Sequence, residues 1–112
     1  MEKIIQIFET REGKCPFLEW LLTLRDIKAR AIIRARIERI RFGNLGDCKS
    51  VGKGVYELRV HFGAGYRIYL GKDGLKTVIL LCGGDKGTQK RDIARAILLW
   101  MEYNYGTQKL SK

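Results

Sequence analysis

Five residues suited to phosphate binding and proton transfer lie close together in the second half of the chain. They are two arginines, a histidine, a tyrosine and a lysine: Arg59, His61, Arg67, Tyr69 and Lys86. An arginine guanidinium stays charged and can make two hydrogen bonds with phosphate oxygens, whereas a lysine contributes a point charge. A histidine has an unperturbed pKa of about 6.5, so it can accept or donate a proton near neutral pH. These side chains could form a site for a phosphodiester if the fold brings them together.

Some of these residue types also have simpler explanations. Tyr69 could stack on a base, relay a proton or pack in the interior. Glu57 could act as a base or simply pair with an arginine, and Lys49 and Lys53 could bind a nucleic-acid backbone through charge alone. Polar residues that alternate along a strand commonly just face water, and this alternative stays open at the level of the sequence.

The candidate residues belong to a stretch that predicts three consecutive strands. Apolar and polar residues alternate over 55–62 and again over 66–70, which is typical of half-buried strands. The glycine-rich segment 63–65 between them predicts a hairpin turn. The next run, 76–82, is almost wholly apolar and predicts a strand that is covered on both faces.

Pairing of the first two strands would gather the candidate residues on one face of a sheet. If the apolar faces of the two strands are aligned, Arg59 and His61 lie beside Arg67 and Tyr69. The Gly-Gly-Asp corner after the third strand can then deliver Lys86 to the rim of the same sheet.

The rest of the chain supplies the helices that must support this sheet. Residues 3–8 predict a first strand, and Pro16 suits the first turn of a helix that contains Phe17, Trp20, Leu21 and Leu24. Asp26 predicts the N-cap of a second helix over 27–42, with Ala29, Ile32, Ile33, Ile37 and Ile40 on its buried stripe and arginines and lysines opposite. Residues 45–54 predict a loop or weak strand. A closing helix over 88–103 has Ile93, Ile97, Trp100 and Met101 on one stripe, and the polar tail 104–112 is expected to be loose.

This order predicts one domain over residues 1–112 with an α+β fold. The sheet is expected to be mainly antiparallel and four- to five-stranded, with two N-terminal helices and a C-terminal helix packed against it. We expect the helices on one face, with the other face partly open.

Composition narrows the class of partner. The 112 residues have a net charge of +10, which favours a polyanionic partner such as nucleic acid or the ribosome. The three cysteines are too far apart for a zinc ligand set or a disulfide framework, and one histidine argues against a histidine-rich metal site. We expect no cofactor or metal. No signal-peptide or membrane-span pattern occurs, so a cytoplasmic protein is expected.

Five phrases in the same order resemble the RelE/ParE superfamily of bacterial toxins, in its HigB-like "addiction module killer protein" branch. They are FLEWLLTL (17–24), GNLGD (43–47), VGKGVYELR (51–59), GAGYRIY (63–69) and GGDKGTQ (83–89). The resemblance spans roughly residues 4–97. It implies a RelE-like fold and a toxin–antitoxin hetero-oligomer in which an antitoxin, often a helix-turn-helix protein, holds the toxin inactive. RelE and HigB members cleave mRNA in the ribosomal A site.

The resemblance also implies roles for individual residues. Arg67, in the Gly-Tyr-Arg phrase, matches the arginine that contacts the scissile phosphate, and Arg59 and His61 lie where basic strand residues of the family point. Lys86 matches a basic residue after the last strand. The catalytic tyrosine of the family often lies near the start of the last helix, where this chain has Thr88 and Gln89 instead. Tyr69 is therefore a weaker match.

The expected function is ribosome-dependent endoribonuclease activity without a metal, in which the 2′-OH of the RNA attacks the adjacent phosphate. Arg67 would clamp the phosphate beside Arg59, Lys86 would lie near the leaving oxygen, and His61 would transfer a proton. Lys49 and Lys53 would bind RNA. Two alternatives stay open: a ParE-like inhibitor of DNA gyrase without chemistry of its own, and a basic nucleic-acid-binding module.

Overall fold

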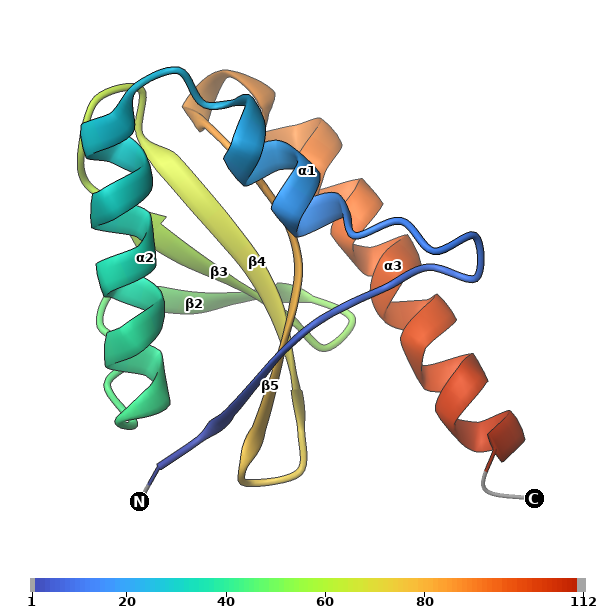
Figure 1. Ribbon diagram of the computed structural model, residues 1–112. Helices are drawn as coiled ribbons and strands as arrows, with labels where there is room; N and C mark the ends of the chain where they lie inside the picture. The colour runs from blue at the N-terminus through green and yellow to red at the C-terminus, as the bar shows by residue number, and fades with distance from the viewer. Residues whose placement is uncertain (1, 111–112) are drawn as a thin grey trace.

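A five-stranded sheet with helices on both faces forms the centre of the computed structural model, which describes residues 2–110 and the side chains of residues 2–106 (Figure 1). In chain order the elements are β1 (Ile4–Ile7), α1 (Pro16–Thr23), α2 (Ile27–Arg41), β2 (Cys48–Gly52), β3 (Val55–Val60), β4 (Tyr66–Asp73), β5 (Thr77–Gly84), the short 3-10 helix η1 (Lys86–Thr88) and α3 (Gln89–Leu110). The strand order is β1-β5-β4-β3-β2. Only β1 pairs in parallel, with β5. The predicted α+β class with a mainly antiparallel sheet is confirmed.

Local sequence signals fix the helix boundaries. Pro16 begins α1, where its missing N–H costs no hydrogen bond. The side chain of Asp26 caps α2 by accepting hydrogen bonds from the backbone N–H groups of Lys28 and Ala29. Gly43, with φ of 89°, ends that helix in the left-handed conformation that glycine tolerates best. The predicted weak strand in 45–54 is the edge strand β2.

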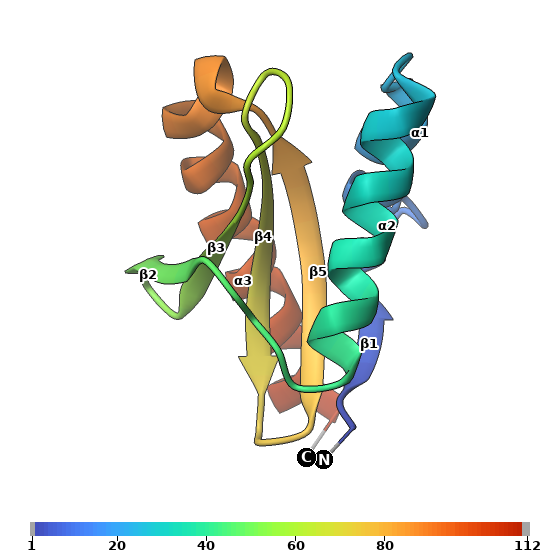
Figure 2. The same cartoon turned by 90° about the vertical axis from the view of Figure 1, so that its left-hand side faces the viewer.

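The helices cover both faces of the sheet, so the expectation that they share one face was wrong. Figure 2 shows α1 and α2 on one side of β4 and β5 and α3 on the other. Apolar residues of β3, β4 and β5 that point towards α1 and α2, such as Leu58 and Ile68, form one core cluster. Val55, Tyr69 and Leu81 point the opposite way and form a second cluster with α3. The apolar residues of α3 need such a surface, and the face opposite α1 and α2 provides it.

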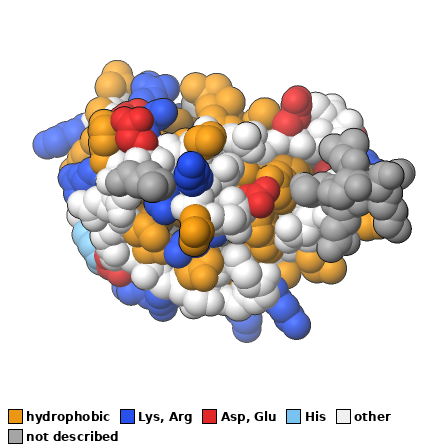
Figure 3. All heavy atoms as spheres, turned by 90° about the horizontal axis from the view of Figure 1, so that it is seen from below, with side chains coloured by type: hydrophobic (Ala, Val, Ile, Leu, Met, Phe, Trp, Pro, Cys, Tyr) orange, Lys and Arg blue, Asp and Glu red, His pale blue; other side chains and the backbone are white. Residues whose placement is uncertain are grey.

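Three of the four residues predicted on the buried stripe of α3, Ile93, Ile97 and Trp100, pack into the second core cluster. The prediction was wrong for Met101, which is 59% exposed, and it missed Ala96 and Leu99, which are buried. The helix continues to Leu110, so the tail was wrongly predicted to be loose over 104–110; residues 111–112 lie outside the described residues. Seen from below, hydrophobic side chains gather in the middle of the surface and basic side chains lie around much of its rim (Figure 3).

The close approach of α3 to the sheet depends on a glycine in β4. A Cβ added at Gly71 would overlap the indole ring of Trp100. Neither the backbone of β4 nor this large buried ring can easily move aside. Gly71 therefore provides the space in which Trp100 seals the second core cluster.

We expect Gly71→Ala to lower the free energy of unfolding by about 1–3 kcal/mol, because the added methyl group overpacks the Trp100 contact. Urea denaturation measures the loss. Gly106→Ala is the matched control, because no atom lies within 4 Å of the added Cβ in α3. Alanine in a helix should leave stability unchanged or raise it by up to about 1 kcal/mol. Equal effects of the two substitutions would contradict this account of Gly71.

Candidate functional site

A hollow of about 460 Å³ lies at the end of the β3–β4 hairpin. Its lining residues come from β3, the hairpin turn, β4, η1 and the first residue of α3: Arg59, Val60, His61, Gly65, Tyr66, Arg67, Lys86 and Gln89. Four of the five predicted catalytic residues are therefore neighbours in space. The fifth, Tyr69, does not line the hollow. We call this hollow the arginine cradle.

Strand register explains why the two arginines meet. Arg59 lies directly opposite Arg67 in the antiparallel β3–β4 pair, so their side chains emerge side by side on one face of the sheet. Arg67 is in turn opposite Gly84, the last residue of β5. The chain that leaves β5 therefore passes the arginines, and the backbone N–H of Lys86 donates to the carbonyl of Ala64 in the hairpin turn at 3.3 Å. This contact delivers Lys86 to the cradle.

Arg67 is largely buried yet contributes to the wall of the cradle. Its side chain is 10% exposed, and its Nη1 donates a hydrogen bond of 2.6 Å to the carbonyl of Gly65. Its Nε lies 3.7 Å from Oε2 of Glu57, which is an ion pair without a hydrogen bond. Gly65 adopts φ of +76°, and a Cβ there would come within 3.4 Å of both Arg67 and Lys86. Glycine thus keeps the turn close to the two cations.

A buried carboxylate beneath the cradle holds the arginines together. Glu57 is fully buried, and its carboxylate accepts hydrogen bonds from Arg59 Nε (3.2 Å), Tyr69 Oη (3.0 Å) and Gln89 Nε2 (2.8 Å). Burial alone would raise the pKa of Glu57. The three hydrogen bonds and the charge of Arg67 outweigh burial and hold the pKa below its usual value. Glu57 is therefore an anion that pairs with arginines, not a base open to a substrate.

Tyr69 has a supporting position under α3. Its side chain is fully buried, and its hydroxyl donates to Glu57. Burial, followed by the negative charge of Glu57, raises the pKa of Tyr69 strongly. A buried, protonated hydroxyl of this kind can neither stack on a base nor take a proton from a substrate. Of the interpretations open at the level of the sequence, packing fits its position.

His61 is the group in the cradle best suited to move a proton near neutral pH. Its side chain is 72% exposed, and its Nε2 lies 2.5 Å from Oδ2 of Asp47. The hydrogen bond with His61 is the main reason that the pKa of Asp47 is lowered. The carboxylate on one ring nitrogen orients the imidazole. Lys49 and Lys53, in contrast, are exposed on β2 and its turn and lie outside the cradle.

Two residues in and near the cradle, Gln89 and Arg36, were not among the predicted site residues. Gln89 donates to Glu57 from the start of α3, where the helix dipole adds partial positive charge. Arg36 occupies a buried position of α2, although its sequence neighbours indicate only a basic helix face. The spacing of Arg36 from the buried Ile33 and Ile40 was the available hint, because residues three and four apart share a helix face.

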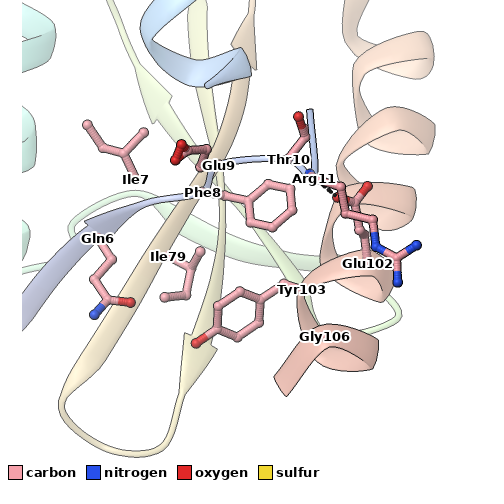
Figure 4. A pocket seen from close by; sticks show the side chains of 10 residues that line it. All are labelled: Gln6, Ile7, Phe8, Glu9, Thr10, Arg11, Ile79, Glu102, Tyr103 and Gly106. Atoms are coloured by element: carbon pink, nitrogen blue, oxygen red, sulfur yellow. Dashed lines mark hydrogen bonds between the residues drawn. The ribbon is translucent and has the colours of Figure 1, made fainter. Parts of the chain in front are cut away.

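Another hollow, of about 360 Å³, lies between β1 and the C-terminal half of α3, far from the arginine cradle in the sheet order (Figure 4). The rings of Phe8 and Tyr103 and the side chain of Ile79 point into it. Arg11 lies at its edge, where the backbone N–H of Arg11 donates to Glu102. This lining is mainly apolar and lacks the cluster of cations that a phosphate requires.

Among residues 2–110, no group of three or more His, Cys, Asp or Glu side chains is arranged to hold a metal ion. Within the same described range, no helix combines the length and apolar character needed to cross a membrane.

Comparison with known proteins gives two findings. Residues 19–98 match the model of a family described as "Phage derived protein Gp49-like (DUF891)". This match includes every residue of the arginine cradle. The chain is also similar to a Haemophilus influenzae protein that is described only as an uncharacterized protein, with 54% identity over 86 residues, 77% of this chain and 87% of the relative.

The Glu57 network predicts a specific pH dependence of stability. Because the folded-state pKa of Glu57 lies below its unfolded value of about 4.3, its contribution is complete above that pH and is lost as the pH falls through the folded pKa. We expect Glu57→Gln to lower the free energy of unfolding by about 1–3 kcal/mol at pH 7. The difference from wild type should shrink below pH ~4.

Urea denaturation at pH 7 and at acid pH measures both effects. Glu12→Gln, at an exposed turn position, is the matched control and should be neutral at each pH. A Glu57→Gln deficit that stays constant down to pH ~3 would contradict a stabilising charge at this position.

Proposed function

Because the chain belongs to the Gp49-like family of phage-derived proteins, a toxin-like family of RelE and HigB type, we propose that it is the toxin of a toxin–antitoxin pair and cleaves mRNA on the ribosome. The observation that carries the proposal is the convergence of Arg59, Arg67 and Lys86 on one hollow, with His61 at its edge. Three cations over one buried carboxylate leave a net positive charge, which suits a phosphodiester.

The proposed reaction uses the RNA's own 2′-OH as the nucleophile. The 2′-oxygen forms a bond to phosphorus while the bond from phosphorus to the 5′-oxygen breaks, giving a 2′,3′-cyclic phosphate and a 5′-OH end. One proton must leave the 2′-OH and one must reach the 5′-oxygen. The charge that builds on the phosphorane oxygens needs donors that are already in position, because such donors cost no reorganisation during the reaction.

Four residues of the cradle suit these tasks. Arg67, held by Gly65 and Glu57, is the principal phosphate clamp, and Arg59 is its partner across the strand pair. Lys86 is exposed, and its ammonium group supplies a point charge for the leaving 5′-oxygen. His61 transfers the proton, with Asp47 as its orienting carboxylate. Glu57 and Tyr69 are positioning residues beneath the site.

The proposed partners follow from the same assignment. A cognate antitoxin would keep the toxin inactive, the ribosome would present the mRNA, and the positive surface would assist the encounter with ribosomal RNA. Lys49 and Lys53, exposed on β2 and its turn, would contribute backbone contacts outside the cradle.

We expect Lys86→Ala and Arg67→Lys each to reduce mRNA cleavage by about 10²–10³-fold. The lysine at 67 keeps the charge but loses the planar fork, so it separates geometry from charge. Cleavage is measured by primer extension on cellular mRNA after brief expression, and by cutting of a programmed ribosome. Lys76→Ala, at the exposed β4–β5 turn, is the control and should cleave normally.

A single 2′-deoxy nucleotide at the cut site should abolish cleavage, because the proposed nucleophile is then missing. Folded, soluble Lys86→Ala and Arg67→Lys proteins with wild-type cleavage would refute the roles of these residues. DNA-damage signalling without mRNA cuts would instead indicate a gyrase inhibitor.

We expect His61→Asn to lower single-turnover cleavage by about 10²–10⁴-fold at neutral pH and to flatten the pH–rate profile. Because His61 is mostly exposed, the substitution should change the urea midpoint little. Asp47→Asn removes the orienting carboxylate and should reduce the rate less than His61→Asn does. An unchanged pH–rate profile in His61→Asn would show that another group transfers the proton.

A further inference from the structure

A hollow that we call the second hollow adjoins the arginine cradle, and it is separate from the hollow between β1 and α3. It has a volume of about 390 Å³ and lies between α2, the loop after α2 and the end of β3. The two hollows share Arg59, Val60 and His61, so they are neighbours on one continuous surface. The second hollow adds Arg36 and Arg39 from α2, together with Asn44, Gly46 and Asp47 from the loop.

Arg36 is built into this hollow in an unusual way. It is 8% exposed although it carries a full charge, and it takes a place on the face of α2 that otherwise holds Ile33 and Ile40. Its Nη2 donates a hydrogen bond of 2.9 Å to the carbonyl of Leu45. Its Nη1 is buried and makes no hydrogen bond with the described residues. A buried polar group without a partner costs free energy, so an acceptor that reached this nitrogen would recover that cost.

The backbone beside Arg36 is shaped to leave room for the guanidinium. Gly46 has φ of +61°, and a Cβ at this position would overlap the guanidinium of Arg36. The side chain of Asn44 accepts a hydrogen bond from the N–H of Gly46 and fixes the loop in this form. The loop therefore has a defined conformation at the wall of the hollow.

The charges in the second hollow also favour an anion. Burial, and then repulsion from Arg39, lowers the pKa of Arg36. Among the described residues, Asp47 supplies the one carboxylate that lines this hollow, and it already pairs with His61. Arg59 is paired with Glu57, two residues away on the same face of β3. Arg36 and Arg39 thus remain without a carboxylate partner within the described residues, and an added anion would relieve their repulsion.

We propose that the second hollow binds a further phosphate of the same RNA strand whose scissile phosphate lies in the arginine cradle. This inference rests on the proposed function, because it assigns the substrate's neighbouring nucleotide to a defined place. A strand that crosses both hollows passes Arg67 in the first and Arg36 in the second, with Arg59 lining both. A positively charged groove of this kind is how proteins follow a single-stranded backbone. Arg36 and Arg39 are therefore binding residues and take no part in the chemistry.

The test uses oligonucleotides that bind but cannot be cut. Dinucleotides with 2′-O-methyl groups are prepared with no terminal phosphate, with a 5′-phosphate and with a 3′-phosphate, and their binding is followed by NMR chemical shifts. One of the two terminal phosphates should tighten binding to the wild-type protein by about tenfold, as expected for one charge-assisted contact. Arg36→Gln and Arg39→Gln should each remove most of this gain.

Arg34→Gln is the matched control, because Arg34 is exposed on the same helix and lines neither hollow. It should retain the gain from the terminal phosphate. Arg39 is also exposed, so Arg39→Gln remains informative if the buried substitution Arg36→Gln prevents folding.

Two readouts separate this inference from the proposed function. Binding of the dinucleotide without a terminal phosphate, and its loss in Arg67→Lys, report the arginine cradle alone. If that binding and mRNA cleavage are intact but neither terminal phosphate improves affinity, the second subsite is refuted and the proposed function stands. The second subsite is also refuted if both Arg36→Gln and Arg39→Gln retain the affinity gained from the terminal phosphate. Wild-type protein that binds none of the oligonucleotides would overturn the second subsite, whereas the proposed function is decided separately by the mRNA cleavage assay.

Discussion

The fully buried carboxylate of Glu57 is the interaction on which the rest of the site depends. Two arginines opposite each other on neighbouring strands repel, and both lie where solvent screens them poorly. Glu57 lies beneath them and offers one oxygen to Arg59 and the other towards Arg67. Tyr69 and Gln89 complete its hydrogen bonds, so the anion itself is stabilised without water. The protein can therefore present concentrated positive charge at a surface, because the single carboxylate offsets part of the repulsion between the two arginines.

The two helical layers cover opposite faces of the sheet and contribute differently to the site. On one face, α1 and α2 make an ordinary apolar core with β3, β4 and β5. On the other face, α3 covers Tyr69 and Glu57 and leaves the ends of β3 and β4 open at Arg59 and Arg67. The cradle is thus the part of a mostly covered face that the helix does not reach. Its position at a strand end also lets η1 and the start of α3 supply Lys86 and Gln89.

Alternating side chains made the hairpin and the meeting of Arg59 with Arg67 predictable, because a period of two fixes which residues share a strand face. The same pattern does not say what covers that face. Glu57 and Tyr69 alternate like residues that face water, yet α3 buries them, and their mutual hydrogen bond satisfies both. The buried place of Arg36 was also hidden, because it depends on Leu45 and Gly46 from a loop whose path has no periodicity.

The parallel pairing of β1 with β5 determines when, during synthesis of the chain, the sheet around the arginine cradle can be completed. Ile4 is paired with Thr77, so β1 has no strand partner until β5 has been synthesised. Such long-range contacts must close a large loop before they stabilise the sheet. Gln89 reaches Glu57 from still further along the chain. A nascent chain therefore lacks the assembled arginine cradle until β5 and the start of α3 have been synthesised and have folded onto the hairpin.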